Sequence, residues 1–228
     1  MDELTPVSAD MQNEKPESRP RRRSRKAESP SRELLLKAAR REFASKGLEG
    51  ARVDEIARRA GVNKQLVYHH FNNKDDLYKA VLEAAYARIR AEEAALDLSS
   101  CEPMEAMQRL IGFSFDYLSK NRDFVALLTD ENLHRGRHLK RSEELPKLHS
   151  PLIAVIADTL RRGEALGCFR AGVDPVQLYI SIAGLGFFFF NNIHTLSSIF
   201  ERKLDEPGQI ANRREHVIEL VMKSLRPD

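Results

Sequence analysis

The sequence predicts an all-α fold, with a small N-terminal helical unit followed by a larger helical body. Apolar residues recur at helical spacing through most of the chain, and no stretch shows the sustained alternation that is typical of a strand. Prolines provide the second indication, since Pro103, Pro146, Pro175 and Pro207 lie near expected helix starts, where proline is tolerated. Hydrophobic residues make up 42% of the 228 residues, which is enough for a sizeable core.

Glycine, asparagine and proline positions predict where the helices begin and end. The first helix begins near residues 29–31 and ends at Gly47, which is well placed as a left-handed residue after a helix. Its buried stripe is expected to hold Leu34, Leu35, Ala38, Ala39 and Phe43. Asn73 is expected to cap a long helix that runs from Lys74 to about Leu96. Later helices are expected near 103–119, 122–133, 146–166, 175–199 and 208–225, with an irregular polar segment at 134–145 and Pro151 as a possible interruption.

The most specific pattern lies between Val53 and Leu77. One buried helix face is marked by Val53, Ile56, Ala57 and Ala60. Gly61 stands where this helix must end and the chain must turn, and Asn63 can cap a second helix from Lys64 to Phe71. Two short helices joined by a glycine-containing turn form a helix-turn-helix. The second helix of such a unit can lie in the major groove of DNA, where base edges distinguish all four pairs.

A set of residues at fixed spacing extends this pattern: Gly47, Ile56-Ala57, Gly61-Val62, Lys64, Tyr68-His69-His70-Phe71, Lys74 and Leu77. Together they resemble the DNA-binding domain of the TetR family of bacterial repressors, over roughly residues 34 to 82. Residues 83–228 resemble that family only in helical character. A weaker resemblance to its RutR-like branch rests on Glu131-Asn132-Leu133 and on a segment that holds Gly163, Gly167-Cys168-Phe169-Arg170 and Asp174-Pro175.

The second helix of the unit carries the candidate DNA contacts. Lys64 and Gln65 lie in its first turn, where lysine suits guanine and glutamine suits adenine, and Leu66 could touch a thymine methyl group. Tyr68 and His69 are better placed for phosphates. Lys74 is placed similarly, at the start of the next helix. These positions match those that resemble the family's DNA contacts, whereas Val67, His70 and Phe71 are expected to face the core.

Arg52 departs from the family pattern, which usually has Thr or Ser just before the second helix. Arginine cannot replace that hydroxyl as a cap, and the loss of a cap costs ~1 kcal/mol of local stability. Its guanidinium can still reach a phosphate. Arg52 is therefore predicted to contact the DNA backbone.

Charge is concentrated at the N-terminal end of the chain. The formal net charge is +3, but residues 1–78 hold 17 basic and 13 acidic side chains, against 20 and 21 in the rest. Residues 1–28, rich in Pro, Ser, Glu and Arg, are expected to be a disordered arm. Six positive charges lie between Arg19 and Lys26, and they could enter a minor groove or add only nonspecific affinity. The expected organisation is this arm, a DNA-binding domain at 29–78, and an effector-binding and dimerisation domain at 79–228.

Several features predict the cellular setting. Cys101 and Cys168 suggest neither a disulfide framework nor a zinc cluster, which fits a reducing cytoplasm. The N-terminus has no apolar segment typical of a signal peptide. The most apolar run, Leu178 to Phe190, is too short to cross a bilayer core of about 30 Å. We therefore expect a cytoplasmic protein with no membrane partner.

The helix expected at 175–199 is apolar nearly all round, so it must be covered on more than one face. Packing against a second copy of the chain is the economical explanation, and the resemblance implies a dimer through the last two helices. A small-molecule effector would need a cavity in the body. Candidate lining residues are Phe113, Tyr117, Phe124, Tyr179, Phe187, Phe190, Asn191 and His194. The alternative for these side chains is ordinary hydrophobic core.

The favoured hypothesis is a homodimeric repressor that binds a palindromic double-stranded DNA operator and is released by a small-molecule effector. An architectural DNA-binding protein without an effector is the first alternative. A metal-binding helical protein is the second, because His134 and His138 are four residues apart. Gly136 between them and the dense Arg and Lys neighbourhood argue against a metal site. We find no phosphate loop, nucleophile elbow or zinc-protease motif, so neither catalysis nor a cofactor is expected.

Overall fold

The computed structural model describes residues 30–227, and the predicted all-α fold is confirmed for them. The helices in chain order are α1 (Pro30–Gly50), α2 (Val53–Ala60), α3 (Lys64–His70), α4 (Lys74–Ala94), η1 (Leu98–Ser100), α5 (Pro103–Lys120), α6 (Arg122–Leu133), η2 (Leu139–Arg141), α7 (Glu144–Ala165), α8 (Pro175–Asn191), α9 (Ile193–Ile199) and α10 (Pro207–Ser224), where η marks a 3-10 helix. The basic arm predicted at 1–28 lies outside the described residues.

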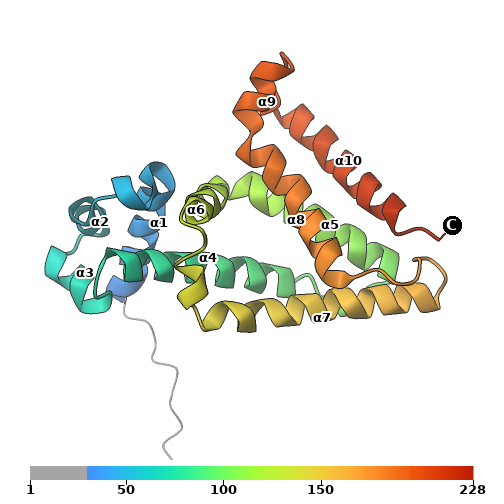
Figure 1. Cartoon of the computed structure of the whole chain (residues 1–228), viewed down its shortest axis with the longest axis horizontal. Coiled ribbons are helices and arrows are strands. Elements are labelled where there is room, and N and C mark those ends of the chain that lie inside the picture. Colours follow the sequence, from blue (N-terminus) through green and yellow to red (C-terminus); the bar gives the residue numbers. More distant parts are fainter. Residues whose placement is uncertain (1–29, 228) are drawn as a thin grey trace, which may run out of the picture.

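Helices α1 to α3 and the first part of α4 form one unit, the head, at one end of the molecule (Figure 1). Its core includes Phe43 of α1, Ile56 of α2, Val67 of α3 and Tyr78 of α4. The prediction for Leu34 is wrong, since this side chain is 51% exposed. The buried face of α1 is instead made by Leu35 and the residues three, four and eight positions after it.

Local capping explains the short elements of the head. Gly61 ends α2 in the left-handed conformation, with φ 69°. Asn63 Oδ1 accepts the Leu66 N–H at 2.9 Å, and Asn73 Oδ1 accepts the Asp76 N–H at 2.8 Å. Each side chain satisfies a backbone donor that the first turn of a helix leaves unpaired, so both predicted caps are confirmed. Arg52 precedes α2 without any side-chain cap, also as predicted.

The end predicted for the first helix is only partly right. The chain does turn at Gly47, with φ 66° and ψ 176°, but helical structure then resumes as far as Gly50. The kink frees the Leu48 N–H, which donates to the Asp130 carboxylate at 2.9 Å. An added Cβ at residue 47 would lie 2.6 Å from Asp130 Oδ1. The turn therefore depends on a group of α6 that local sequence does not reveal.

The remaining helices form the body around a second hydrophobic core. Helix α5 packs against α7, α8 and α10, while α4 extends from the head into the body along α7 (Figure 1). Helix α6 packs against α1 and contributes Leu127 to the core of the head. The two units thus meet along α4 and α6.

The single helix predicted at 175–199 is wrong. It is broken at Asn192 into α8 and α9, whose axes are bent by 68°. Asn192 Nδ2 donates to the Phe188 carbonyl at 2.8 Å, a local bond that competes with helix continuation. Conversely, Pro151 lies inside α7 and does not end it. Within residues 30–227, no helix by itself has both the length and the apolar character to cross a membrane, although the bent pair α8 and α9 together would.

Candidate nucleic-acid interface and ligand cavity

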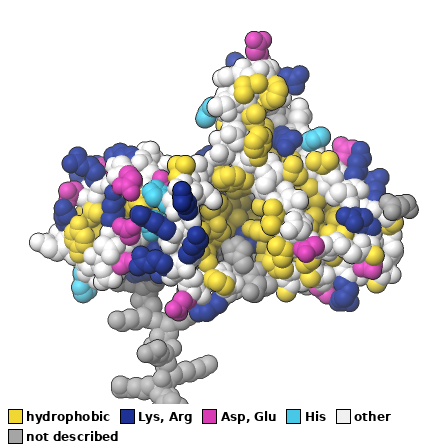
Figure 2. Space-filling view, viewed as in Figure 1, with side chains coloured by type: hydrophobic (Ala, Val, Ile, Leu, Met, Phe, Trp, Pro, Cys, Tyr) yellow, Lys and Arg dark blue, Asp and Glu magenta, His cyan; other side chains and the backbone are white. Residues whose placement is uncertain are grey.

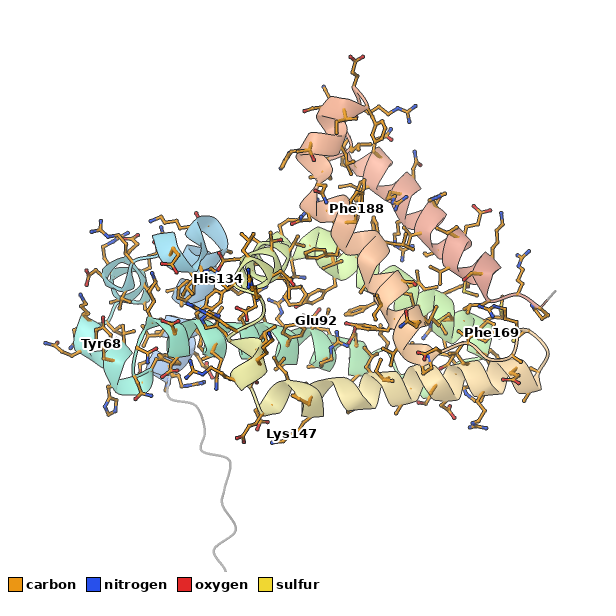
Figure 3. The ribbon with its side chains drawn as sticks, viewed as in Figure 1. Tyr68, Glu92, His134, Lys147, Phe169 and Phe188 are labelled. Carbon is orange, nitrogen blue, oxygen red and sulfur yellow. The ribbon has the colours of Figure 1, made fainter. Side chains whose placement is uncertain are left out.

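Helix α3 lies at the outer end of the head and leaves most of its side chains at the surface (Figures 1 and 3). Val67 is buried, and it packs the helix against the core of the head. Lys64, Gln65, Tyr68 and His69 are exposed, and Leu66 is half-buried. Tyr68 is a large side chain, 44% exposed, that projects from the end of the molecule. Among the residues expected to face inward, Phe71 is buried and His70 is half-buried against Ser31.

Charged residues flank this helix. Arg52 is exposed in extended backbone just before α2. Lys74 Nζ donates to the Glu49 carbonyl at 3.1 Å, so it also ties the start of α4 to the end of α1. Lys64 Nζ lies 2.8 Å from Asp54 Oδ1, and this carboxylate raises the pKa of Lys64. Lys64 must therefore exchange Asp54 for any base that it contacts.

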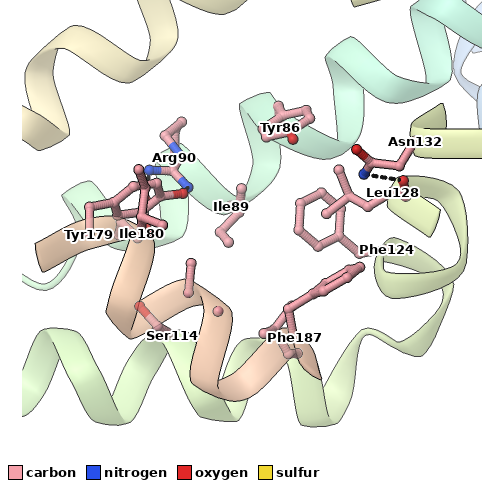
Figure 4. Close-up of a pocket in the computed structure, with 14 residues that line it drawn as sticks. Tyr86, Ile89, Arg90, Ser114, Phe124, Leu128, Asn132, Tyr179, Ile180 and Phe187 are labelled. Carbon is pink, nitrogen blue, oxygen red and sulfur yellow. Dashed lines mark hydrogen bonds and ion pairs between the residues drawn. The ribbon is translucent and has the colours of Figure 1, made fainter. Parts of the chain in front are cut away.

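The body contains a cavity of about 310 Å³ between α4, α5, α6 and α8 (Figure 4). Its walls are mostly apolar, and its polar groups come from a few side chains. The lining residues are Tyr86, Ile89, Arg90, Glu93, Ser114, Leu118, Phe124, Leu128, Asn132, Tyr179, Ile180, Ala183, Gly184 and Phe187. An apolar cavity with a small number of polar groups is the usual form of a site for a small molecule.

The residues proposed from sequence as an effector site divide into three groups. Phe124, Tyr179 and Phe187 line the cavity. Phe190, Asn191 and His194 line a separate surface pocket beside α6 and α9. Tyr117 is buried in the core, and Phe113 packs against its ring at 5.8 Å between centroids.

Sequence reasoning missed Arg90 and Glu93, two charged residues of α4 that line the cavity and are 8% and 4% exposed. Arg90 Nη2 donates to the Tyr179 hydroxyl at 3.1 Å, and its guanidinium lies 5.5 Å from the centre of that ring. Arg90 Nη1 lies 2.8 Å from Glu93 Oε2. Burial raises the pKa of Glu93 to about 7. The sequence signal that could have identified them is helical spacing, because Arg90 and Glu93 share a face of α4 with the buried Ile89.

Helix α6 faces the cavity on one side and the head on the other. Phe124, Leu128 and Asn132 line the cavity. Asp130 accepts the Tyr78 hydroxyl at 2.8 Å, besides the Leu48 N–H. A change in the position of α6 would therefore alter contacts with both α1 and α4.

A buried hydrogen bond between His138 and Glu131 reinforces the contact of α6 with the head. His138 Nδ1 lies 2.6 Å from Glu131 Oε2, and both side chains are almost fully buried. The other ring nitrogen of His138 lies 3.1 Å from Asp75 Oδ1 in the first turn of α4, and it lowers the pKa of Asp75. His138 thus bridges the end of α6 to the head. His134 bonds back to the Asp130 carbonyl through Nδ1, and its Nε2 lies 3.6 Å from Glu49 Oε1 of α1.

Comparison with known proteins decides the family. Residues 35–81 match the family of bacterial regulatory proteins called tetR, and residues 103–221 match the tetracyclin repressor-like C-terminal domain. The chain is 33% identical over 196 residues to the HTH-type transcriptional repressor NicS of Pseudomonas putida, covering 86% of this chain and 92% of that protein. The chain belongs to the TetR family. It is a transcriptional regulator with a helix-turn-helix DNA-binding domain, which confirms the family and fold that its motifs predicted.

Other relatives and solved structures also correspond to this chain over most of its length. The repressor AcnR of Corynebacterium diphtheriae is 26% identical over 202 residues, covering 87% of this chain and 93% of that protein. The crystal structure of the regulator SCO4942 from Streptomyces coelicolor superposes with a TM-score of 0.64 at 26% identity, covering 86% of this chain and 99% of the other. FadR of Bacillus subtilis in complex with stearoyl-CoA shares the fold, with a TM-score of 0.62 at 17% identity over 85% and 99% of the two chains.

Proposed function

We propose that this TetR-family protein is a homodimeric repressor that binds a palindromic operator and leaves it when a small molecule enters the body cavity. The observation that carries the DNA-binding part is the exposed face of α3 with Lys64, Gln65, Tyr68 and His69. Lys64 and Gln65 reach base edges in the major groove, and Tyr68 and His69 meet phosphates. Arg52 and Lys74 contact the DNA backbone on either side. Such a regulator acts in the cytoplasm, where the DNA is.

Release requires coupling between the cavity and α3, and α6 supplies the path. A ligand between Phe124 and Phe187 presses on α6, whose far side holds Leu48 and Tyr78 through Asp130. Moving α6 shifts the head relative to the body, and so changes the separation of the two recognition helices in a dimer. A coupling of this kind is typically worth 1–3 kcal/mol and is reciprocal.

The dimer is supported by an uncovered apolar stripe on α8. Val176, Ile180 and Phe188 are 45%, 54% and 60% exposed, and they lie four and eight residues apart on one helix face. Gly184 completes the same row and also lines the cavity. Among the described residues, no atom outside its chain neighbours and its own helix backbone lies within 4 Å of the position that a Cβ would occupy there. Figure 2 shows hydrophobic side chains gathered on this part of the body. A second copy that covers the stripe would place two α3 helices for successive major grooves, about 34–36 Å apart.

The test is selection of bound duplexes from a random pool by the full chain, at near-physiological salt. A palindrome with half-sites about one helical turn apart is the expected result. A pool with no enriched sequence would overturn the proposed operator binding and favour the architectural alternative. The selected duplex then serves as the probe for release by small molecules.

A further inference from the structure

The Arg90–Glu93 pair is an unusual feature in the lining of a cavity, because neither charged group has its full set of hydrogen bonds. Among the described residues, Arg90 Nε and Nη1 and Glu93 Oε2 are buried without an aligned hydrogen-bond partner. The contact between Nη1 and Oε2 is short at 2.8 Å but poorly directed. Buried polar atoms in native proteins are rarely left in this condition, so unpaired donors that line a cavity indicate a ligand.

We propose that the cavity binds a small carboxylic acid with an apolar body as its anion, and that the ligand's carboxylate takes the place of Glu93 on Arg90. This inference rests on the proposed function, since it names the chemical class of the effector. A carboxylate offers two oxygens to neighbouring guanidinium N–H groups, which is the geometry that arginine recognises best. Arg90 Nη1 has no aligned partner among the described residues, and Nη2 has a second N–H besides the one it donates to Tyr179, so these two neighbouring nitrogens form the fork.

An anion is favoured over a cation because only one member of the pair can lose its charge. Arginine cannot be deprotonated in proteins, so a cationic ligand would be buried next to a fixed positive charge. Glu93 can take up a proton near neutral pH, since burial raises its pKa to about 7. When an anion binds Arg90, protonation of Glu93 therefore removes the repulsion between the two carboxyl groups.

The rest of the cavity defines the body of the ligand. Ile89, Phe124 and Phe187 form apolar walls between the Arg90 end and the opposite end, where Asn132 lies (Figure 4). A volume of about 310 Å³ is at the lower end for ligand sites and suits a molecule with one ring or a medium alkyl chain. Arg90 and Glu93 also line a second cavity of about 340 Å³ on the α7 side, which provides space for Glu93 to turn away.

Calorimetric titration of the full chain tests the proposal with named probes. Benzoate, phenylacetate and octanoate are each compared with the corresponding neutral amide, and benzylamine serves as the cationic probe. At least one carboxylate is expected to bind ten times more tightly than its amide. The affinity of the protein for this carboxylate is expected to fall about tenfold from pH 6 to pH 8. The reason is that binding needs protonated Glu93, whose fraction falls by that factor when its pKa is about 7.

Variants separate this site from a general charge effect. Arg90→Gln is expected to abolish the preference for the carboxylate, whereas Arg88→Gln, which removes an exposed arginine of the same helix, is expected to retain it. Glu93→Gln is expected to bind the carboxylate with no pH dependence, which tests the proposal even if Arg90→Gln fails to fold. The inference is overturned if no carboxylate binds more tightly than its amide, if benzylamine binds best, or if the pH dependence persists in Glu93→Gln. Release from the selected operator is measured separately, so carboxylate binding without release would contradict only the regulatory coupling.

Discussion

At the scale of single residues, the proposed DNA contacts differ in what they read. Gln65 is expected to recognise a base, so Gln65→Ala should reduce discrimination at one operator position by about 1–3 kcal/mol.

Arg52 is expected to contact a phosphate, so Arg52→Ala should weaken binding to all sequences equally. It should also lower the salt slope, the slope of log affinity against log salt concentration, by about one. Fluorescence anisotropy with operator and scrambled duplexes at several salt concentrations measures both effects.

The control for these variants is Lys223→Ala, which removes an exposed positive charge from α10, far from the head. It should leave both the affinity and the salt slope unchanged. If Gln65→Ala weakens operator and scrambled duplexes alike, then residue 65 does not read a base.

Glu93 also predicts a pH dependence of stability. Its pKa is raised to about 7 in the folded protein from an ordinary value of 4.5, so folding favours its protonated form. The contribution of Glu93 to the free energy of unfolding is therefore fully present below about pH 4.5. It is lost as the pH rises to about 7, with a total of roughly 3 kcal/mol. The charged groups around it are Arg90 on its own helix and Lys147 of α7, which lines the same second cavity.

Urea denaturation at pH 5 and pH 8 measures this effect. The free energy of unfolding of wild type minus that of Glu93→Gln should decrease from pH 5 to pH 8. Glu92→Gln is the matched control, because Glu92 directly precedes Glu93 but is only half-buried and forms an ion pair with the exposed Arg88. If the free energy of unfolding of wild type minus that of Glu92→Gln decreases by the same amount, the pH dependence does not come specifically from Glu93.

At the scale of elements, the joint between α1 and α6 depends on Gly47. Gly61 has φ 69° and ψ 29°, the left-handed region, where alanine costs about 1–2 kcal/mol of backbone strain. Gly47 has φ 66° and ψ 176°, a region that is open essentially only to glycine, where the strain is about 1–3 kcal/mol. At Gly61 the added Cβ would meet no atom of the described residues within 4 Å apart from its chain neighbours, whereas at Gly47 it would meet Asp130. Moving that carboxylate breaks its bonds to Leu48 and Tyr78, a further loss of about 1–3 kcal/mol.

Chemical denaturation of Gly47→Ala and Gly61→Ala compares a glycine at the contact between α1 and α6 with one outside it. We expect Gly47→Ala to be the less stable variant, and to bind the operator less tightly because the head is repositioned. Equal losses in the two variants would mean that Asp130 adjusts without cost and that the joint is not rigid.

The elements also show what could be predicted from sequence. Helix-turn-helix structure was predictable because its signals are local: Gly61 turns the chain, and Asn63 and Asn73 cap the helices that follow. The break at Asn192 was not, since asparagine occurs in many uninterrupted helices and the apolar pattern continues across it.

The cavity was harder to predict than the DNA-binding face. The exposure of Lys64 and Gln65 follows from the face of one helix, which local periodicity defines. Arg90 and Tyr179 are 89 residues apart in the sequence and come from different helices, so no local pattern pairs them. Tyr117, an equally plausible aromatic by sequence, is instead part of the core.

At the scale of the whole molecule, the apolar stripe on α8 predicts the oligomeric state. Phe188 is 60% exposed and belongs to this stripe, so Phe188→Glu would bury a charge in the proposed dimer interface. An unpaired buried charge costs several kcal/mol, which is enough to separate the subunits. We expect sedimentation velocity to report a dimer for wild type and a monomer for Phe188→Glu. Because the proposed operator is a palindrome that two heads recognise, the monomer should also lose most of its operator affinity.

The matched control is Leu166→Glu, which changes an equally exposed leucine, 65% exposed, just after α7 and away from the stripe. It should remain a dimer with unchanged operator affinity. A Phe188→Glu protein that stays dimeric would mean that α8 is not the interface. The two α3 helices would then be separated by a different distance, and the half-site spacing found by selection would show which arrangement the dimer adopts.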